Sequence, residues 1–415
     1  MTDGFDAVVV GSGPAGCTAA ILLGRAGARI ALLEAHRDPA HYKRLCTHSI
    51  RSSALPTIQR LGVEPALEEL GAVRAHENSC TEFGWIRETG VPRRRPDHGL
   101  NVRRQTLDPL MRATAAAVPG VTLMTGTRAR ELTRDEAGRV NGVVAETGGQ
   151  SREIRARFVV GADGNSSKIA ELAKLDGEVT SNPRFGYFAG YRGVRTPPGV
   201  SHSQWFGEQD VSYFFRNDGE VTILASFLDK ARLSEFRDDR EAALLGMFAD
   251  LPHGPDLSTA ERVTDVIGTT DYPFITRKRI VAPGVVLVGD AAMVGDPLWG
   301  VGCGWAFQSA EWLSRAVAPV LTSGSPAEID AAARRYQRKH RRQLRPHQRL
   351  CVDYSKNKDS SPLVDLIVGG AVRDAKVADR FLDVVTRNRS PLTLLSPLVL
   401  ARSAVTVRRA AAATR

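Results

Sequence analysis

The sequence predicts an α/β fold: a Rossmann-like domain that carries an inserted, β-sheet-rich second domain and is followed by a helical C-terminal region. Three observations support this prediction. A strand, a glycine-rich turn, a helix and a second strand follow one another at the N-terminus. Aromatic and β-branched strand patterns fill residues 184–228, and helical periodicity dominates from about residue 326. The length of 415 residues also favours more than one domain.

The N-terminal pattern has the spacing of a dinucleotide-binding site. A buried strand precedes the glycine-rich turn, which consists of Gly11, Ser12, Gly13, Pro14, Ala15 and Gly16. Such glycines allow a tight turn, close approach of a pyrophosphate, and close packing of the helix on the strand. The positive end of the helix favours phosphate. The second strand ends at Glu34 and Ala35. The Glu34 carboxylate can accept hydrogen bonds from ribose hydroxyls and would repel a 2′-phosphate, so FAD or NAD is expected here.

Two later motifs favour FAD. A buried strand ends in Ala162-Asp163-Gly164, and another, 284–289, ends at Asp290. Open α/β sheets place ligands at the carboxyl ends of their strands. An aspartate there can hold ribityl hydroxyls. We expect a helix that begins directly after Asp290 to face the pyrimidine edge of the flavin, where reduction adds negative charge.

The three motifs, in this order, resemble those of flavoprotein monooxygenases of the hydroxybenzoate hydroxylase fold. That superfamily includes geranylgeranyl reductases and flavin-dependent halogenases, and the resemblance spans roughly residues 5 to 320. It implies that FAD is bound by the motif residues and also by Arg44, Arg104, Arg128, Ala129, Gly300, Val301 and Gly302.

The resemblance also implies how the chain is divided. We expect an FAD-binding domain formed by residues 1–44, 100–184 and 272–325. We expect a substrate domain formed by 45–99 and 185–271, and a helical C-terminal region over 326–415.

The stretch after Asp290 is most similar to the geranylgeranyl reductase branch. It contains Asp296-Pro297 and a Gly-x-Gly spacing, and the loop around Cys46 also resembles a cysteine-containing loop of that branch that approaches the flavin ring. Where those reductases carry a tryptophan and a proline in the substrate domain, this chain has Tyr213 and Arg216. Residues 75–81 contain no lysine, which a halogenase of the family would need.

Aromatic residues of the second domain are candidates for the substrate pocket. These candidates are Trp85, Tyr191, Trp205, Tyr213 and Phe215, together with Cys46 and His48 of the loop near the flavin. The sequence reveals no dedicated acid or base, so the catalytic residues stay open.

The first functional hypothesis is an FAD-dependent monooxygenase, which would use NADPH or NADH and O2 to oxygenate a small organic substrate, a specialised metabolite, through a flavin hydroperoxide. The alternative is a reductase of carbon–carbon double bonds, and a halogenase is a more distant one. A non-enzymatic module that only binds FAD is a fourth possibility.

Composition limits the other classes of function. The net charge is +10, but the basic run 334–349 is not interleaved with several aromatics, so no nucleic-acid partner is expected. Five scattered cysteines indicate a reduced, cytoplasmic protein without a metal site. No apolar run reaches the roughly 20 residues of a membrane span. The apolar segments 362–368 and 392–400 suit a cap over the site, a homodimer interface or a membrane contact, and the choice between monomer and homodimer stays open.

Overall fold

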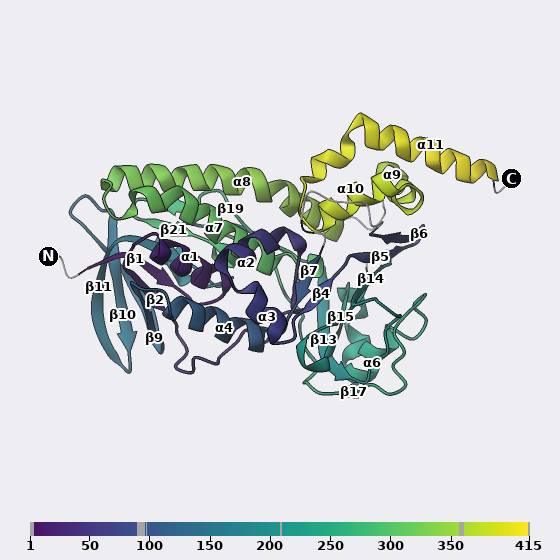
Figure 1. The fold of residues 1–415 in the computed structure, drawn as a ribbon, viewed down its shortest axis with the longest axis horizontal. Coiled ribbons are helices and arrows are strands. Elements are labelled where there is room, and N and C mark those ends of the chain that lie inside the picture. Colours follow the sequence, from purple (N-terminus) through teal and green to yellow (C-terminus); the bar gives the residue numbers. More distant parts are fainter. Residues whose placement is uncertain (1–3, 89–95, 97, 208–209, 357–360, 414–415) are drawn as a thin grey trace.

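The computed structural model describes residues 4–88, 96, 98–207, 210–356 and 361–413. It confirms the predicted α/β architecture with several sheets and a helical C-terminal region (Figure 1). The first sheet has eight strands, and its main order is β20-β21-β11-β1-β2-β8. Its strands are β1 (Phe5–Val10), β2 (Ile30–Leu33), β8 (Val121–Met124), β9 (Thr127–Arg134), β10 (Val140–Thr147), β11 (Gln150–Gly161), β20 (Val281–Ala282) and β21 (Val285–Leu287).

The centre of this sheet is parallel, and its strands therefore end at a common edge. β1 pairs with both β2 and β11, β11 pairs with β21, and β2 pairs with β8, all in parallel. The central strands are buried on both sides, as their continuous apolar sequences predict. Helices that pack with this sheet include α1 (Pro14–Arg25), α4 (Arg104–Ala116), α5 (Lys168–Leu172) and α7 (Gly302–Leu321). Helix α1 contacts both α4 and α7.

The second large sheet is built mainly from the predicted strand-rich segment. Its main order is β17-β13-β16-β15-β14-β5-β6, and β18 also pairs with β13. Its strands are β5 (Asn78–Thr81), β6 (Gly84–Arg87), β13 (Arg184–Arg192), β14 (His202–Phe206), β15 (Val211–Arg216), β16 (Thr222–Asp229), β17 (Glu261–Arg262) and β18 (Ile267–Thr269). A turn at 217–219 joins β15 to β16, with Gly219 at φ +64° inside the short 3-10 helix η2 (Asp218–Glu220).

Two sheets of three strands and several short helices complete this region. One sheet has the order β12-β19-β22 and the other the order β3-β7-β4. Their strands are β12 (Gly177–Thr180), β19 (Phe274–Arg277), β22 (Met293–Val294), β3 (Ser49–Ile50), β7 (Gly99–Asn101) and β4 (Val73–Ala75). The short helices are η1 (Ser52–Ala54), α2 (Leu55–Leu61), α3 (Glu64–Glu69), η3 (Lys230–Phe236), α6 (Arg240–Gly246), η4 (Gly289–Ala291) and η5 (Pro297–Trp299).

The segment 45–99 contributes residues both to the core around the first sheet and to the second large sheet. Ile58, Leu61 and Leu67 of α2 and α3 pack into the same core as the first sheet, whereas β5 and β6 join the second sheet. The domain boundaries stay a prediction, and this packing places α2 and α3 with the first sheet instead of the second.

The C-terminal region is helical, as predicted. Its elements are α8 (Pro326–Lys356), α9 (Pro362–Arg373), α10 (Ala375–Val385), η6 (Pro391–Leu395) and α11 (Pro397–Ala413). Figure 1 shows α8 along one outer edge of the molecule, with α9, α10 and α11 gathered beyond its end. Among the described residues, no helix has both the length and the apolar character that crossing a membrane requires.

Candidate functional site

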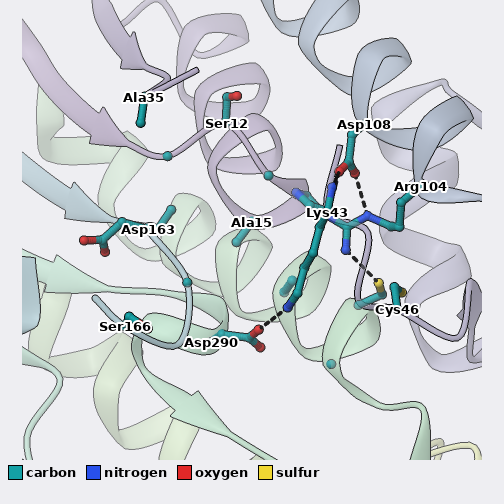
Figure 2. A pocket seen from close by; sticks show the side chains of 18 of the residues that line it. Ser12, Ala15, Ala35, Lys43, Cys46, Arg104, Asp108, Asp163, Ser166 and Asp290 are labelled. Atoms are coloured by element: carbon teal, nitrogen blue, oxygen red, sulfur yellow. Dashed lines mark hydrogen bonds and ion pairs between the residues drawn. The ribbon is translucent and has the colours of Figure 1, made fainter. Parts of the chain in front are cut away.

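A cavity of about 670 Å³ lies where the parallel strands of the first sheet end. The residues that line it include Glu34, Ala35, Arg128, Gly300, Gly302 and Cys303. Figure 2 shows Ser12 and Ala35 on one side, Asp163 and Asp290 around its edge, and Arg104 with Cys46 on the other side. The three predicted motifs therefore meet in one elongated space, because strand ends that are far apart in sequence share the same sheet edge.

The glycine turn has the geometry of a phosphate cradle. Gly11 has φ +100°, and a Cβ atom there would lie 2.5 Å from the carbonyl oxygen of Ala162. A Cβ on Gly16 would lie 1.8 Å from the carbonyl oxygen of Gly11, so this glycine allows α1 to pack against the turn. A Cβ on Gly13 would meet no atom within 4 Å, although Gly13 lines the cavity. The open side of Gly13 thus leaves the backbone accessible to a ligand at the start of α1.

Glu34 is held in place at the end of β2. Its carboxylate accepts hydrogen bonds from the hydroxyl of Ser12 and, at 2.8 Å, from the backbone N–H of His36. Only 7% of Glu34 is exposed, yet it lines the cavity. A buried, oriented carboxylate in this position suits ribose hydroxyls.

Hydrogen bonds from residues that follow it closely in sequence hold the Asp163 side chain in place. The Ser167 hydroxyl and the Ile169 N–H donate to its carboxylate at 2.6 Å and 3.0 Å. Burial raises the pKa of Asp163, and these hydrogen bonds oppose the shift. Asp163 therefore shapes the start of α5 while it lines the cavity.

Asp290 forms an ion pair that the sequence did not predict. The Lys43 ammonium donates to its carboxylate at 3.2 Å (Figure 2). The nearby Asp290 carboxylate raises the pKa of Lys43, which favours the charged form of this lysine in the cavity. The expected helix directly after Asp290 is wrong: only η4 forms there, and α7 begins at Gly302.

Lys43, and not the predicted Arg44, lines the cavity. Arg44 does not line the cavity, because its guanidinium points outward and pairs with Asp265 at 2.7 Å. The side chains of this ion pair are 61% and 74% exposed. In a loop without regular structure, neighbouring side chains point in different directions, and sequence alone did not identify the one that faces inward.

Arg104 is the first residue of α4 and lies buried at the end of the cavity that Cys46 and Cys303 also line. Its guanidinium donates to both carboxylate oxygens of Asp108, at 2.6 Å and 2.9 Å. Its backbone N–H donates to Nδ1 of His48 at 3.0 Å. Burial lowers the pKa of His48, which agrees with an unprotonated Nδ1. Asp108 was missed by sequence reasoning, although an acid four residues after a helical arginine is a recognisable pairing.

Two thiols lie beside Arg104. Cys46 and Cys303 both line the cavity, and the Arg104 guanidinium lies 3.9 Å from the Cys303 sulfur. A hydrogen bond from Cys303 lowers the pKa of Cys46 well below its ordinary value, whereas the same contact and burial raise the pKa of Cys303. Tyr272, which the sequence did not single out, lines this end as well.

The loop that precedes α7 is anchored by buried charges. Arg51 donates to the carbonyl oxygen of Trp299 through Nε and Nη2, at 3.2 Å and 3.1 Å, and to both oxygens of Glu77. Asp296 pairs with Arg184 at 3.3 Å, with both side chains almost fully buried. These contacts position Gly300 and Gly302 against the cavity. Val301 points away from it and packs beside Trp305 and Leu344.

The aromatic candidates divide between the two faces of the second sheet. Trp85, Tyr191 and Trp205 belong to an apolar cluster with Phe236 and Phe248, on the face away from the cavity loops. None of these three residues is among the described residues that line the cavity, because alternate residues of a strand point to opposite faces, and their role as pocket residues stays a prediction.

Tyr213 and Phe215 belong to the other face, which we call the inner face. This face packs against Leu45, Leu298 and Trp299, and the Tyr213 hydroxyl donates to the carbonyl oxygen of Leu298. Neither residue is among the described residues that line the cavity. His48 also lies outside that lining, so of the predicted substrate residues Cys46 alone contacts the cavity directly.

Comparison with known protein families identifies the family of this chain. The model of the family described as "FAD binding domain" matches residues 4–223, more than half of the chain. The chain belongs to this FAD-binding family. FAD is therefore its cofactor, as the three motifs predicted.

Individual relatives agree with the predicted class of FAD-dependent oxidoreductase. Menaquinone reductase of Mycolicibacterium smegmatis is 26% identical over 355 residues, 80% of each chain. The 6-methylpretetramide 4-monooxygenase of Streptomyces rimosus is 33% identical over 182 residues, 41% of each chain. The solved structure of the flavin-dependent brominase Bmp2 shares the fold, with a TM-score of 0.78, 17% identity, and coverage of 97% of this chain and 98% of that one.

The residues present fit FAD. The open face of Gly13 suits the pyrophosphate, and buried Glu34 suits the adenosine ribose. Asp290 with Lys43 offers both an acceptor and a cation farther along the cavity. Arg104 and the Gly300–Gly302 turn lie at the end left for the ring system. Which atoms each residue contacts stays a prediction.

Proposed function

We propose that this protein is an FAD-dependent monooxygenase that adds one oxygen atom of O2 to a small, largely apolar organic substrate, with NADH or NADPH as electron donor. The observation that carries this proposal is the apolar inner face of the second sheet. Phe188, Phe215 and Phe227 pack there with Leu298, and the Tyr213 hydroxyl is already bonded to a backbone carbonyl. This face packs against Leu45, which lines the cavity, and so backs the ring end with apolar side chains that exclude water.

The chain's own residues position the substrate and shield it from water. The cofactor supplies the redox chemistry when bound. Lys43 and Arg104 bring positive charge into the cavity, which favours the extra negative charge of a reduced flavin. The likeness to 6-methylpretetramide 4-monooxygenase supports a substrate from specialised metabolism.

The test is isotopic. Purified, FAD-loaded protein would be incubated with NADH or NADPH, a panel of polycyclic aromatic substrates and ¹⁸O2, and the products weighed by mass spectrometry. We expect one heavy oxygen atom per product molecule. Turnover of a substrate without incorporation of the label would overturn the proposal.

A second candidate is the reduction of a carbon–carbon double bond. The likeness to menaquinone reductase over 80% of the chain favours it, as does the thiol of Cys46 in the cavity. Such a reaction needs a proton as well as a hydride, and the hydrogen-bonded pair of Cys46 and Cys303, in which Cys303 holds the proton, can exchange one at the ring end. Anaerobic turnover with dithionite-reduced enzyme separates the two candidates, because only the reductase forms product without O2.

A further inference from the structure

Helix α8 carries seven arginines on one side. They are Arg334, Arg335, Arg338, Arg341, Arg342, Arg345 and Arg349. With about 100° of rotation per residue, they fall within an arc of about 120°. We call this arc the arginine stripe, and it extends over roughly 22 Å of helix. Tyr336, His340 and Leu344 occupy the opposite side and are buried, so the stripe faces away from the core.

The stripe has no neutralising partners on the protein. No acidic residue occurs between positions 334 and 349. Within the described part of the chain, none of the seven arginines forms an ion pair, and six of them are exposed. Burial lowers the pKa of Arg345, and its neighbours Arg341 and Arg349 lower it further. These like charges repel one another, so an external anionic surface would stabilise the arrangement.

Exposed leucines lie in and just after a short helix that contacts α8. The short helix η6 contacts α8 and leads into α11. Leu392, Leu395 and Leu398 are 66%, 49% and 67% exposed. Figure 1 shows α8 on the outer edge of the molecule, with the C-terminal helices continuing beyond it. The helix that carries the stripe thus contacts an element that carries exposed leucines.

We propose that the arginine stripe and these leucines dock the protein on the surface of an anionic lipid bilayer. The stripe would lie along the headgroups, and the leucines would enter the boundary between headgroups and acyl chains. A nucleic acid would also attract the arginines, but it offers no apolar layer for the leucines. The stripe also lacks exposed aromatic side chains for stacking on bases, since Tyr336 is buried. Docking is independent of the reaction performed at the flavin.

The experiment measures sedimentation of the FAD-loaded protein with lipid vesicles. One set of vesicles contains phosphatidylcholine alone, and the other contains an equal mixture of phosphatidylcholine and phosphatidylglycerol. The test variant replaces Arg338, Arg341 and Arg345 with Gln. A matched control replaces Arg152, Arg155 and Arg237 with Gln. These three arginines are exposed and lie outside the stripe, and their replacement lowers the net charge by the same amount. A second variant replaces Leu392 and Leu395 with Ser.

We expect binding to the anionic vesicles only, and weaker binding at high salt. Loss of the three stripe arginines should weaken binding by about tenfold to a hundredfold, and the control by less than about threefold. The leucine variant should also bind more weakly, and the flavin absorbance of every variant should match the parent protein. The proposal is overturned by equal loss in the control, by absence of binding, or by tighter binding to a single-stranded oligonucleotide than to anionic vesicles.

Discussion

The Asp218 carboxylate accepts a hydrogen bond from the backbone N–H of Arg103 at 2.6 Å and another from the Arg103 guanidinium at 3.0 Å. The two residues belong to different units. Asp218 lies in the turn between β15 and β16, and Arg103 immediately precedes α4, which begins with the cavity residue Arg104. Asp218 also accepts from the Thr106 hydroxyl at 2.7 Å. One buried carboxylate therefore ties the second sheet to the helix that presents Arg104.

Replacement of Asp218 should destabilise the folded protein. Asp218→Ala leaves the nearly buried Arg103 guanidinium and the start of α4 without their acceptor, because the carboxylate is only 3% exposed. We expect the free energy of unfolding to fall by about 3 kcal/mol, measured by urea denaturation. Asp265→Ala is the matched control, since it breaks an exposed ion pair with Arg44 and should cost less than about 1 kcal/mol. Equal losses in the two variants would contradict this account.

Two glycines of the same turn should respond in opposite ways to Ala. Gly13 has φ −71° and free space around its Cβ position, so Gly13→Ala should change the free energy of unfolding by less than about 1 kcal/mol. The new methyl group would nevertheless occupy the phosphate cradle. We expect FAD affinity to fall about a hundredfold in a fluorescence titration of the apoprotein.

Gly16→Ala should instead affect folding. Its Cβ would overlap the Gly11 carbonyl oxygen, and backbone cannot move aside as cheaply as a flexible side chain. We expect a loss of at least about 3 kcal/mol in unfolding free energy. If Gly13→Ala were the unstable variant and Gly16→Ala the stable one, the assigned geometry of the turn would be wrong.

A buried histidine should make the protein sensitive to acid. His202 is fully buried, with Nε2 4.0 Å from the Glu77 carboxylate. Burial lowers the pKa of His202 from 6.5 to about 4, with Arg51 adding to the shift and Glu77 opposing it. Between these values the unfolded chain binds a proton that the folded chain does not, so stability is complete above about pH 6.5 and falls toward pH 4.

His202→Gln should remove this dependence. At pH 5 the histidine is expected to cost the folded state about 2 kcal/mol relative to pH 7, since one pKa unit corresponds to about 1.4 kcal/mol. Urea denaturation of parent and variant at both pH values measures the difference. An unchanged loss between pH 7 and pH 5 in the variant would show that other groups carry the acid sensitivity.

The main sheet and its ligand edge were predictable from sequence for a physical reason. Parallel strands buried on both sides appear as continuous apolar runs, and their carboxyl ends meet at one edge. Gly13, Glu34, Asp163 and Asp290 were therefore predicted to lie at that edge, and all four line the cavity. The same reasoning placed β13 to β16, because aromatic and β-branched residues alternate with clear turns.

The orientation of the second sheet was not predictable. Both of its faces are apolar, so sequence did not distinguish the inner face, with Tyr213 and Phe215, from the outer face, with Tyr191 and Trp205. Buried ion pairs such as Arg51–Glu77 join segments that are distant in sequence and leave no local pattern.

The neighbours Lys43 and Arg44 give the sharpest test of the site. Lys43 reaches Asp290 inside the cavity, whereas Arg44 pairs with Asp265 at the surface. Lys43→Met keeps much of the side chain's apolar length but removes the cation and leaves the Asp290 carboxylate unpaired beside the cofactor. We expect its FAD affinity to fall at least about tenfold, because a hydrogen bond to a charged group contributes about 1.5–3 kcal/mol. Arg44→Met is the matched control and should stay within about threefold of the parent protein, since its ion pair is exposed. Both affinities come from quenching of FAD fluorescence by the apoprotein. A larger effect at Arg44 than at Lys43 would return the expected FAD-binding role to Arg44 and would show that this loop rearranges when FAD binds.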